Sequence, residues 1–199
     1  MNGILRSELE QFYLREKQSS AEIAKIFDCS EHKVNYWLRK YKILKRTISE
    51  AVYQKMNKGG DPFKIKDILT LEEAKLMGLG LGLYWGEGNK KNKNAIKLGN
   101  TDPRIIKKFI EFLTDILGAK RSKLRFSLQI FSDISEKQAL RFWLKQLSEC
   151  GINKSQFFKV TITPARSIGT YREKSKYGVL IVYFCNTKLK KILDSMLPL

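Results

Sequence analysis

Glu87 stands at the end of an apolar, glycine-rich segment, and it is the carboxylate of this chain best placed to do chemistry. Three glycines of that segment, Gly78, Gly82 and Gly86, recur at every fourth position, which places them on one face of a helix. A carboxylate in the last turn of a helix faces the negative end of the helix dipole, which is unfavourable unless a cation lies nearby. The pattern therefore predicts a helix over 71–87 with a cation-binding acid at its foot.

The glycines of this helix carry a cost that something must offset. Glycine is a poor helix former, so Gly78, Gly80, Gly82 and Gly86 together disfavour the helix by about 3–4 kcal/mol relative to alanine. A second helix whose backbone approaches the side-chain-free face would supply the compensation. A close-packed core helix that carries a surface glutamate is the plainer interpretation.

Residues 81–88, Leu-Gly-Leu-Tyr-Trp-Gly-Glu-Gly, resemble the last eight letters of the LAGLIDADG motif of homing-endonuclease-like proteins. In that family two such helices pack side by side at a subunit boundary. Because this chain carries one copy, the resemblance implies a homodimer packed through Gly78, Gly82 and Gly86. It also implies that Glu87 is the catalytic acid and that Glu87 and Gly86 hold Mg²⁺ over double-stranded DNA.

The net charge of the chain also favours a nucleic-acid partner. Its 199 residues carry 38 Lys and Arg against 20 Asp and Glu, a net charge of +18, with most of the excess after residue 70. So large an excess suggests a polyanionic partner, most simply nucleic acid. A ribosome-associated or generically basic protein is the alternative.

Other compositional features indicate where the protein works. The cysteines Cys29, Cys150 and Cys185 lie far apart and form no pair with metal-binding spacing. Free thiols fit a reducing compartment, and the sequence has neither a signal-peptide core nor a run of eighteen apolar residues. We therefore expect a soluble cytoplasmic, nucleoid-associated protein with no membrane partner.

The N-terminal segment resembles a helix-turn-helix over residues 20–39. Ser19 and Glu22 form a capping box that begins one helix, and Ser30 caps the next. Asp28 stands in the turn where glycine is commonest. A small helical bundle with a polar surface is the alternative. The side chains of the second helix that could read bases or hold phosphates are His32, Lys33, Asn35, Tyr36 and Arg39.

The order of elements predicts an α+β protein. We expect a helix-turn-helix domain over 1–46, a linker over 47–69, and a LAGLIDADG-like domain over 70–199. The resemblance implies a saddle-shaped antiparallel sheet with helices on one face for the last of these. Its expected strands are 95–100, 123–131, 157–164 and 178–186, the last two joined as a hairpin by a long basic loop.

Residues around these elements are candidates for further DNA contacts. Gly88 is expected as a left-handed cap of the 71–87 helix, followed by a basic loop or frayed edge strand beside Glu87. The candidate DNA contacts in this domain are Lys90, Lys91, Lys93, Arg125, Gln129 and Lys159.

Two function classes follow. The first is a Mg²⁺-dependent, site-specific DNA endonuclease acting as a homodimer. The second is a sequence-specific transcriptional regulator that binds without cutting, and RNA binding in a splicing-linked role is a third possibility. A single histidine, His32, excludes multi-histidine nuclease sites. Trp85 occupies the position of the last glycine in a dinucleotide fingerprint, so no nucleotide cofactor is expected.

Overall fold

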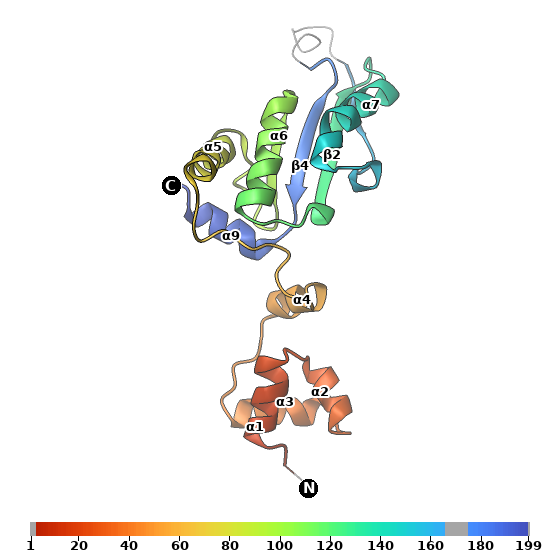
Figure 1. Ribbon diagram of the computed structural model, residues 1–199. Helices are drawn as coiled ribbons and strands as arrows, with labels where there is room; N and C mark the ends of the chain where they lie inside the picture. Colours follow the sequence, from red (N-terminus) through yellow and green to blue (C-terminus); the bar gives the residue numbers. More distant parts are fainter. Residues whose placement is uncertain (1–2, 166–174, 199) are drawn as a thin grey trace. The chain divides into compact units, whose positions relative to one another are not determined.

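The chain divides into two compact units, Met1–Asp61 and Pro62–Leu199 (Figure 1). The structure is a computed structural model that describes residues 3–165 and 175–198. The segment 47–69, expected as a linker, is shared between the two units, because the first contains a helix over Ile48–Met56 and the second begins at Pro62. Together the units form an α+β protein.

The first unit is all-helical around a small apolar core. Leu9, Ile23, Val34 and Leu38 are almost completely buried in it. The backbone of Asp28 adopts a left-handed conformation (φ 44°) in the turn between the second and third helices, a conformation that aspartate tolerates better than most residues. The helical elements are α1 (Arg6–Leu9), the π-type turn η1 (Glu10–Arg15), α2 (Ser20–Ile26), α3 (Glu31–Lys40) and α4 (Ile48–Met56).

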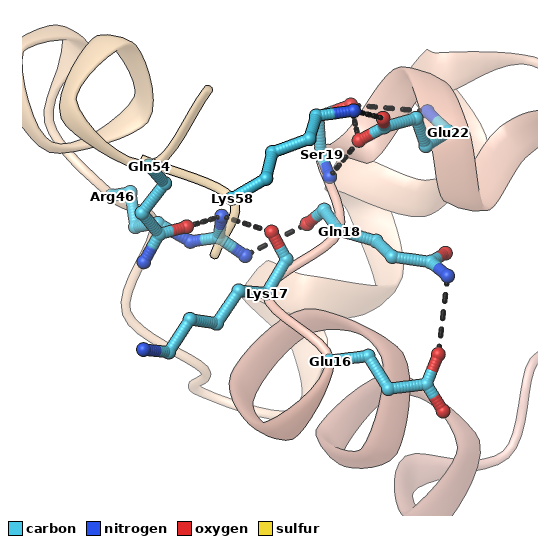
Figure 2. A network of polar contacts seen from close by, with 8 residues as sticks. All are labelled: Glu16, Lys17, Gln18, Ser19, Glu22, Arg46, Gln54 and Lys58. Carbon is cyan, nitrogen blue, oxygen red and sulfur yellow. Dashed lines mark hydrogen bonds and ion pairs between the residues drawn. The ribbon is translucent and has the colours of Figure 1, made fainter. Parts of the chain in front are cut away.

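Arg46 fastens helix α4 to the rest of the first unit. Its guanidinium group donates hydrogen bonds to the backbone carbonyl oxygens of Lys17 (3.0 Å) and Gln18 (2.7 Å) and to the side chain of Gln54 in α4 (Figure 2). It also donates to the backbone carbonyl oxygen of Tyr13 (2.5 Å). The guanidinium carbon also lies 3.9 Å from the centre of the Tyr13 ring, a cation–π contact. One arginine thus joins three segments of the chain.

A second polar contact comes from the residues that follow α4. Lys58 reaches Glu22 in α2 at 3.4 Å, beside the Ser19–Glu22 capping box (Figure 2). That capping box is confirmed: the Glu22 N–H donates to Ser19 Oγ (3.2 Å), and the Ser19 N–H donates to the Glu22 carboxylate (2.9 Å). Polar contacts therefore hold helix α4 to the first unit, and α4 is not part of a free linker.

The second unit is built on a four-stranded mixed sheet with the strand order β1-β4-β2-β3. Strands β1 and β2 each pair antiparallel with β4, whereas β3 pairs parallel with β2. Its elements are α5 (Leu71–Glu87), β1 (Ile96–Asn100), α6 (Pro103–Glu111), η2 (Phe112–Ile116), η3 (Arg121–Lys123), β2 (Leu124–Phe131), α7 (Glu136–Leu147), η4 (Ser148–Cys150), η5 (Lys154–Gln156), β3 (Thr161–Thr163), β4 (Val179–Phe184) and α9 (Thr187–Ser195).

Two sequence-based expectations about this sheet are wrong. The sheet is not antiparallel throughout, because β3 runs parallel to β2. The last two strands do not form a hairpin either, because β2 lies between them. Strand β3 is also far shorter than the expected 157–164, since only Thr161–Thr163 join the ladder. Most of the expected basic loop, residues 166–174, lies outside the described residues.

Helices cover one face of the sheet. Alternate strand residues, such as Leu124, Phe126 and Leu128 of β2, are completely buried in one apolar core with residues of α6 and α7. Trp143 of α7 and Phe109 of α6 are among the largest side chains of that core. The intervening strand residues point to the opposite face, where they are half-buried or exposed. That open face and the end of α5 carry the candidate site.

Candidate nucleic-acid interface

Helix α5 begins and ends where the sequence predicts, and it leaves Glu87 exposed at its foot. Thr70 caps its start by accepting a hydrogen bond from the Glu73 N–H (3.3 Å), and the helix ends at Glu87. Within the described residues the Glu87 carboxylate has no hydrogen bond or ion pair, and no group of three or more His, Cys, Asp or Glu side chains gathers to hold a metal. Glu87 is thus the one carboxylate that this end of the helix offers to a cation.

The glycines of α5 fall into two groups. A Cβ added to Gly80 would lie 2.1 Å from the ring of Phe112, so this position must be side-chain-free for α5 to pack on the core. Gly78, Gly82 and Gly86 have no atom within 4 Å of such a Cβ and face outward. The expected close partner for this face is therefore not supplied by the described part of the same chain.

Gly88 is required for a reason that differs from the expected one. Its backbone is extended (φ −73°, ψ 149°), so the predicted left-handed cap is wrong. Gly88 instead forms an isolated antiparallel bridge with Leu98, the remnant of an edge strand, and a Cβ there would lie 2.3 Å from the carbonyl oxygen of Tyr84. Close approach of the backbone to Tyr84 explains this glycine.

The basic loop after α5 is ordered by asparagine side chains. Asn92 accepts hydrogen bonds from the Asn94 and Ala95 N–H groups (3.0 and 2.8 Å), and its own N–H donates to the Asn89 side chain (3.1 Å). This arrangement leaves Lys91 and Lys93 exposed. Lys90 instead donates to the carbonyl oxygen of Trp85 (2.6 Å) at the end of the helix.

The open face of the sheet carries a row of cationic and aromatic side chains. Lys97 of β1 and Arg125 of β2 both pair in register with Tyr183 of β4, which lies between them. The Lys97 ammonium group lies 4.9 Å from the centre of the Tyr183 ring, and Phe158 meets that ring edge-on at 5.8 Å. Sequence reasoning missed Lys97 and Tyr183, although the alternation of Ile96 and Leu98 with Lys97 already placed that lysine on the outer face.

The residues predicted on β2 share this open face. Arg125 donates to the backbone carbonyl oxygens of Ser122 (2.7 Å) and Leu124 (2.8 Å), and the Gln129 amide donates to Thr163 of β3 (3.3 Å). Lys159 is exposed in the irregular segment before β3. The structure therefore places Arg125 beside the Lys97–Tyr183 pair, and Gln129 lies four residues further along β2 on the same face.

The first unit presents a second polar surface on α3. His32, Tyr36 and Arg39 are exposed there, whereas Lys33 and Asn35 are half-buried. The Ser20 hydroxyl in α2 donates to the side-chain oxygen Oδ1 of Asn35 (3.1 Å), which orients that side-chain amide. Sequence reasoning missed Lys40, an exposed neighbour whose ammonium group lies 4.5 Å from the centre of the Trp37 ring.

A separate basic surface lies on the solvent side of α7. The helix buries Ala139, Trp143 and Leu147, so the cations on its other side point away from the sheet. A shallow hollow there is lined by Lys137, Leu140, Arg141, Leu144, Lys145 and Lys154. This surface belongs to the helical side of the unit and not to the open face of the sheet.

Comparison with known proteins returns no match of the chain to a protein-family model, to a curated protein or to a solved structure. Among the helices in residues 3–165 and 175–198, none combines the length and apolarity needed to cross a membrane.

Proposed function

We propose that this chain is a DNA-binding protein whose Pro62–Leu199 unit binds double-stranded DNA on the open face of its sheet. The row formed by Lys97, Tyr183 and Arg125 is the observation that carries the proposal, because it places two cations and an aromatic ring across neighbouring strands, on the sheet face that none of the described helices covers. The net charge of +18 supports a polyanionic partner over any other class.

The side chains on this face divide into two roles in the proposal. Lys97 and Arg125 neutralise phosphates, which gives affinity without sequence preference. Gln129 and the threonines of β3 carry amide and hydroxyl groups that can donate to and accept from base edges. Proteins that read DNA with strands place such residues in a groove of the duplex.

We propose further that the protein is a homodimer joined through helix α5. Gly78, Gly82 and Gly86 each weaken the helix by about 1 kcal/mol, and their outward face gains no contact within the described part of the chain. Leu79 and Trp85 on the same helix are also about half exposed. A second copy of α5 packed on this face would bury Leu79 and Trp85. The glycines have no side chains, so the two helix backbones could approach closely, as the resemblance to LAGLIDADG helices implies.

Such a dimer would bring two Glu87 carboxylates to the foot of the paired helices. One exposed carboxylate falls well short of the six oxygen ligands that Mg²⁺ requires, but one or two carboxylates with DNA phosphates and water are a usual Mg²⁺ set. A Mg²⁺ ion so held would activate water and stabilise the leaving oxygen of the phosphodiester. In this proposal Glu87 makes the protein a DNA endonuclease, and the exposed backbone at Gly86 contributes room for the cation.

A regulator that binds without cutting is the second candidate. The surface of α3, with His32, Tyr36 and Arg39 exposed, favours it, because a second DNA-reading surface adds sequence specificity and no catalysis. The two candidates differ in whether the bound DNA is cut in a reaction that needs Mg²⁺ and Glu87.

A library selection separates them. The purified protein is incubated with duplex DNA of randomised sequence, once with Mg²⁺ and once with EDTA, and bound and cut molecules are sequenced. The nuclease predicts cut ends only with Mg²⁺, lost in Glu87→Gln while binding persists. Enriched binding without cut ends supports the regulator. If the protein enriches no duplex DNA and instead retains a structured RNA competitor, the proposal of DNA binding is overturned.

A further inference from the structure

A buried lysine lies in the apolar core beneath the foot of α5. The side chain of Lys190 in α9 is only 1% exposed, and its ammonium group pairs with Asp194 one turn later (2.5 Å to Oδ1). Burying an ammonium group is costly even when it is paired, and an apolar side chain of similar volume often gives an equally or more stable core. The stability of the fold therefore does not explain this lysine.

Lys190 reaches the last turn of α5 through Tyr84. The ring of Tyr84 is completely buried, and the Lys190 ammonium group lies 5.7 Å from its centre, a cation–π contact. The Tyr84 hydroxyl in turn donates to the carbonyl oxygen of Asn89 (3.3 Å). Asp194, Lys190 and Tyr84 thus form a chain of polar contacts that ends on the backbone two residues after Glu87.

Lys190 keeps its charge in this buried setting. Burial by itself lowers the pKa of Lys190, but its contacts with Asp194 and Tyr84 outweigh that effect and raise it. Lys190 therefore stays charged beside the Tyr84 ring.

Glu87 depends on this backbone for its position. The Gly88 N–H donates to the Tyr84 carbonyl oxygen (2.9 Å), and the Asn89 N–H donates to the Lys97 carbonyl oxygen (2.9 Å). The Glu87 side chain has no partner of its own among the described residues. The backbone of residues 87–89, which Tyr84 contacts through the Asn89 carbonyl oxygen, therefore fixes the point from which the Glu87 side chain extends.

We propose that Lys190 and Tyr84 are positioning residues that hold Glu87 at the foot of α5. The inference rests on the proposed function, in which Glu87 holds the cation. It assigns to a buried ion pair in α9 the task of ordering an exposed acid on another helix.

Amide hydrogen exchange in the intact protein tests the positioning directly. Tyr84→Phe removes only the hydroxyl, and Lys190→Met keeps the volume and removes the charge. Both changes should speed exchange of the Gly88 and Asn89 amides about fivefold, as expected when a hydrogen bond that holds the segment is removed. Tyr177→Phe and Lys191→Met are the matched controls and should leave these amides unchanged.

The outcome separates positioning from general stabilisation. Positioning predicts that Lys190→Met melts at the same or a higher temperature while the Gly88 and Asn89 amides exchange faster. A fall in melting temperature with faster exchange across the whole core would show a structural role alone and overturn the proposal. If Lys190→Met does not fold, Tyr84→Phe decides, and unchanged exchange at Gly88 and Asn89 overturns the proposal.

Cleavage kinetics extend the test to function. With Mg²⁺ and a selected duplex, Tyr84→Phe should lower the cleavage rate at saturating DNA about tenfold while the Kd for DNA stays unchanged, because a displaced acid affects the reaction and not the binding face. A wild-type protein that binds but does not cut would contradict the nuclease, and the exchange measurements would still decide the positioning.

Discussion

Several side chains on the proposed DNA surfaces are held by their own chain before any ligand arrives. Arg125 is tied to two backbone carbonyl oxygens, Gln129 to Thr163, and Asn35 to Ser20. Side chains ordered in this way lose less conformational entropy when they bind, which favours specific recognition. Glu87 is the exception, and its order must come from the backbone beneath it.

Glu22 makes the stability of the first unit depend on pH. The Ser19 backbone N–H, and then its hydroxyl, lower the pKa of this carboxyl to about 2. Because the pKa is lower in the folded state than in the unfolded state, the stabilisation is complete above pH 4.5 and is lost as the pH falls towards 2. Glu22 is half exposed, so we expect an effect of about 1 kcal/mol.

Urea titrations followed by the NMR signals of the first unit, at several pH values between 5 and 2, would measure it. Glu22→Gln should remove this part of the pH dependence. Glu31→Gln is the matched control, since the Glu31 carboxylate makes no hydrogen bond within the described residues. Equal slopes for wild type and Glu22→Gln would contradict the assignment.

At the scale of the element, the two sides of α5 have different surroundings. Tyr84 and Gly80 pack inward against the core, and the outward face is left without side chains at every fourth position. A helix with apolar residues on all sides is normally buried on all sides. The exposed side of α5 is therefore the part of the second unit that most needs a partner.

Gly82→Leu tests that partner. A Cβ at Gly82 has no atom of the described residues within 4 Å, and leucine improves helix propensity, so the monomer should keep its melting temperature or gain slightly. The same side chain would separate two packed helices, so light scattering should show a monomer in place of a dimer.

Gly80→Ala serves as the control, and it should lower the stability of the folded chain. A Cβ at this position would lie 2.1 Å from the Phe112 ring, so unfolding should become easier by about 1–3 kcal/mol. A Gly82→Leu protein that remains dimeric would contradict packing through this face.

At the scale of the whole molecule, the proposal gives the chain two DNA-binding surfaces. One lies on α3 in Met1–Asp61 and the other on the open sheet face of Pro62–Leu199. Two linked surfaces bind more tightly than either alone when both can reach their sites, because the second binding event becomes intramolecular. Each surface should also contribute its own part of the dependence of DNA affinity on salt concentration.

Salt titrations of DNA affinity, followed by fluorescence anisotropy, separate these shares. Lys33→Ala with Arg39→Ala, and Lys97→Ala with Arg125→Ala, should each reduce the slope of log K against log salt by about 2, because each cation that neutralises a phosphate contributes about 1 to the slope. Lys137→Ala with Arg141→Ala on α7 is the control, because that surface faces away from the sheet. An unchanged slope in either of the first two variants would remove that surface from the interface.

Local features of this protein could be predicted from the sequence alone. The capping boxes at Ser19 and Thr70 follow from interactions between residues three positions apart, which the sequence displays directly. The excess of positive charge is likewise a property of composition.

The tertiary structure decided what depends on contacts between distant segments. The parallel pairing of β3 with β2, the alignment of Lys97 with Tyr183 and Arg125, and the burial of Lys190 beneath Tyr84 all join residues far apart in the chain. Strand alternation shows which face a residue occupies but not which strand lies beside it, and helical periodicity cannot show that a lysine is buried with its charge paired. Register and packing decide both, because they are set by how the whole core fits together.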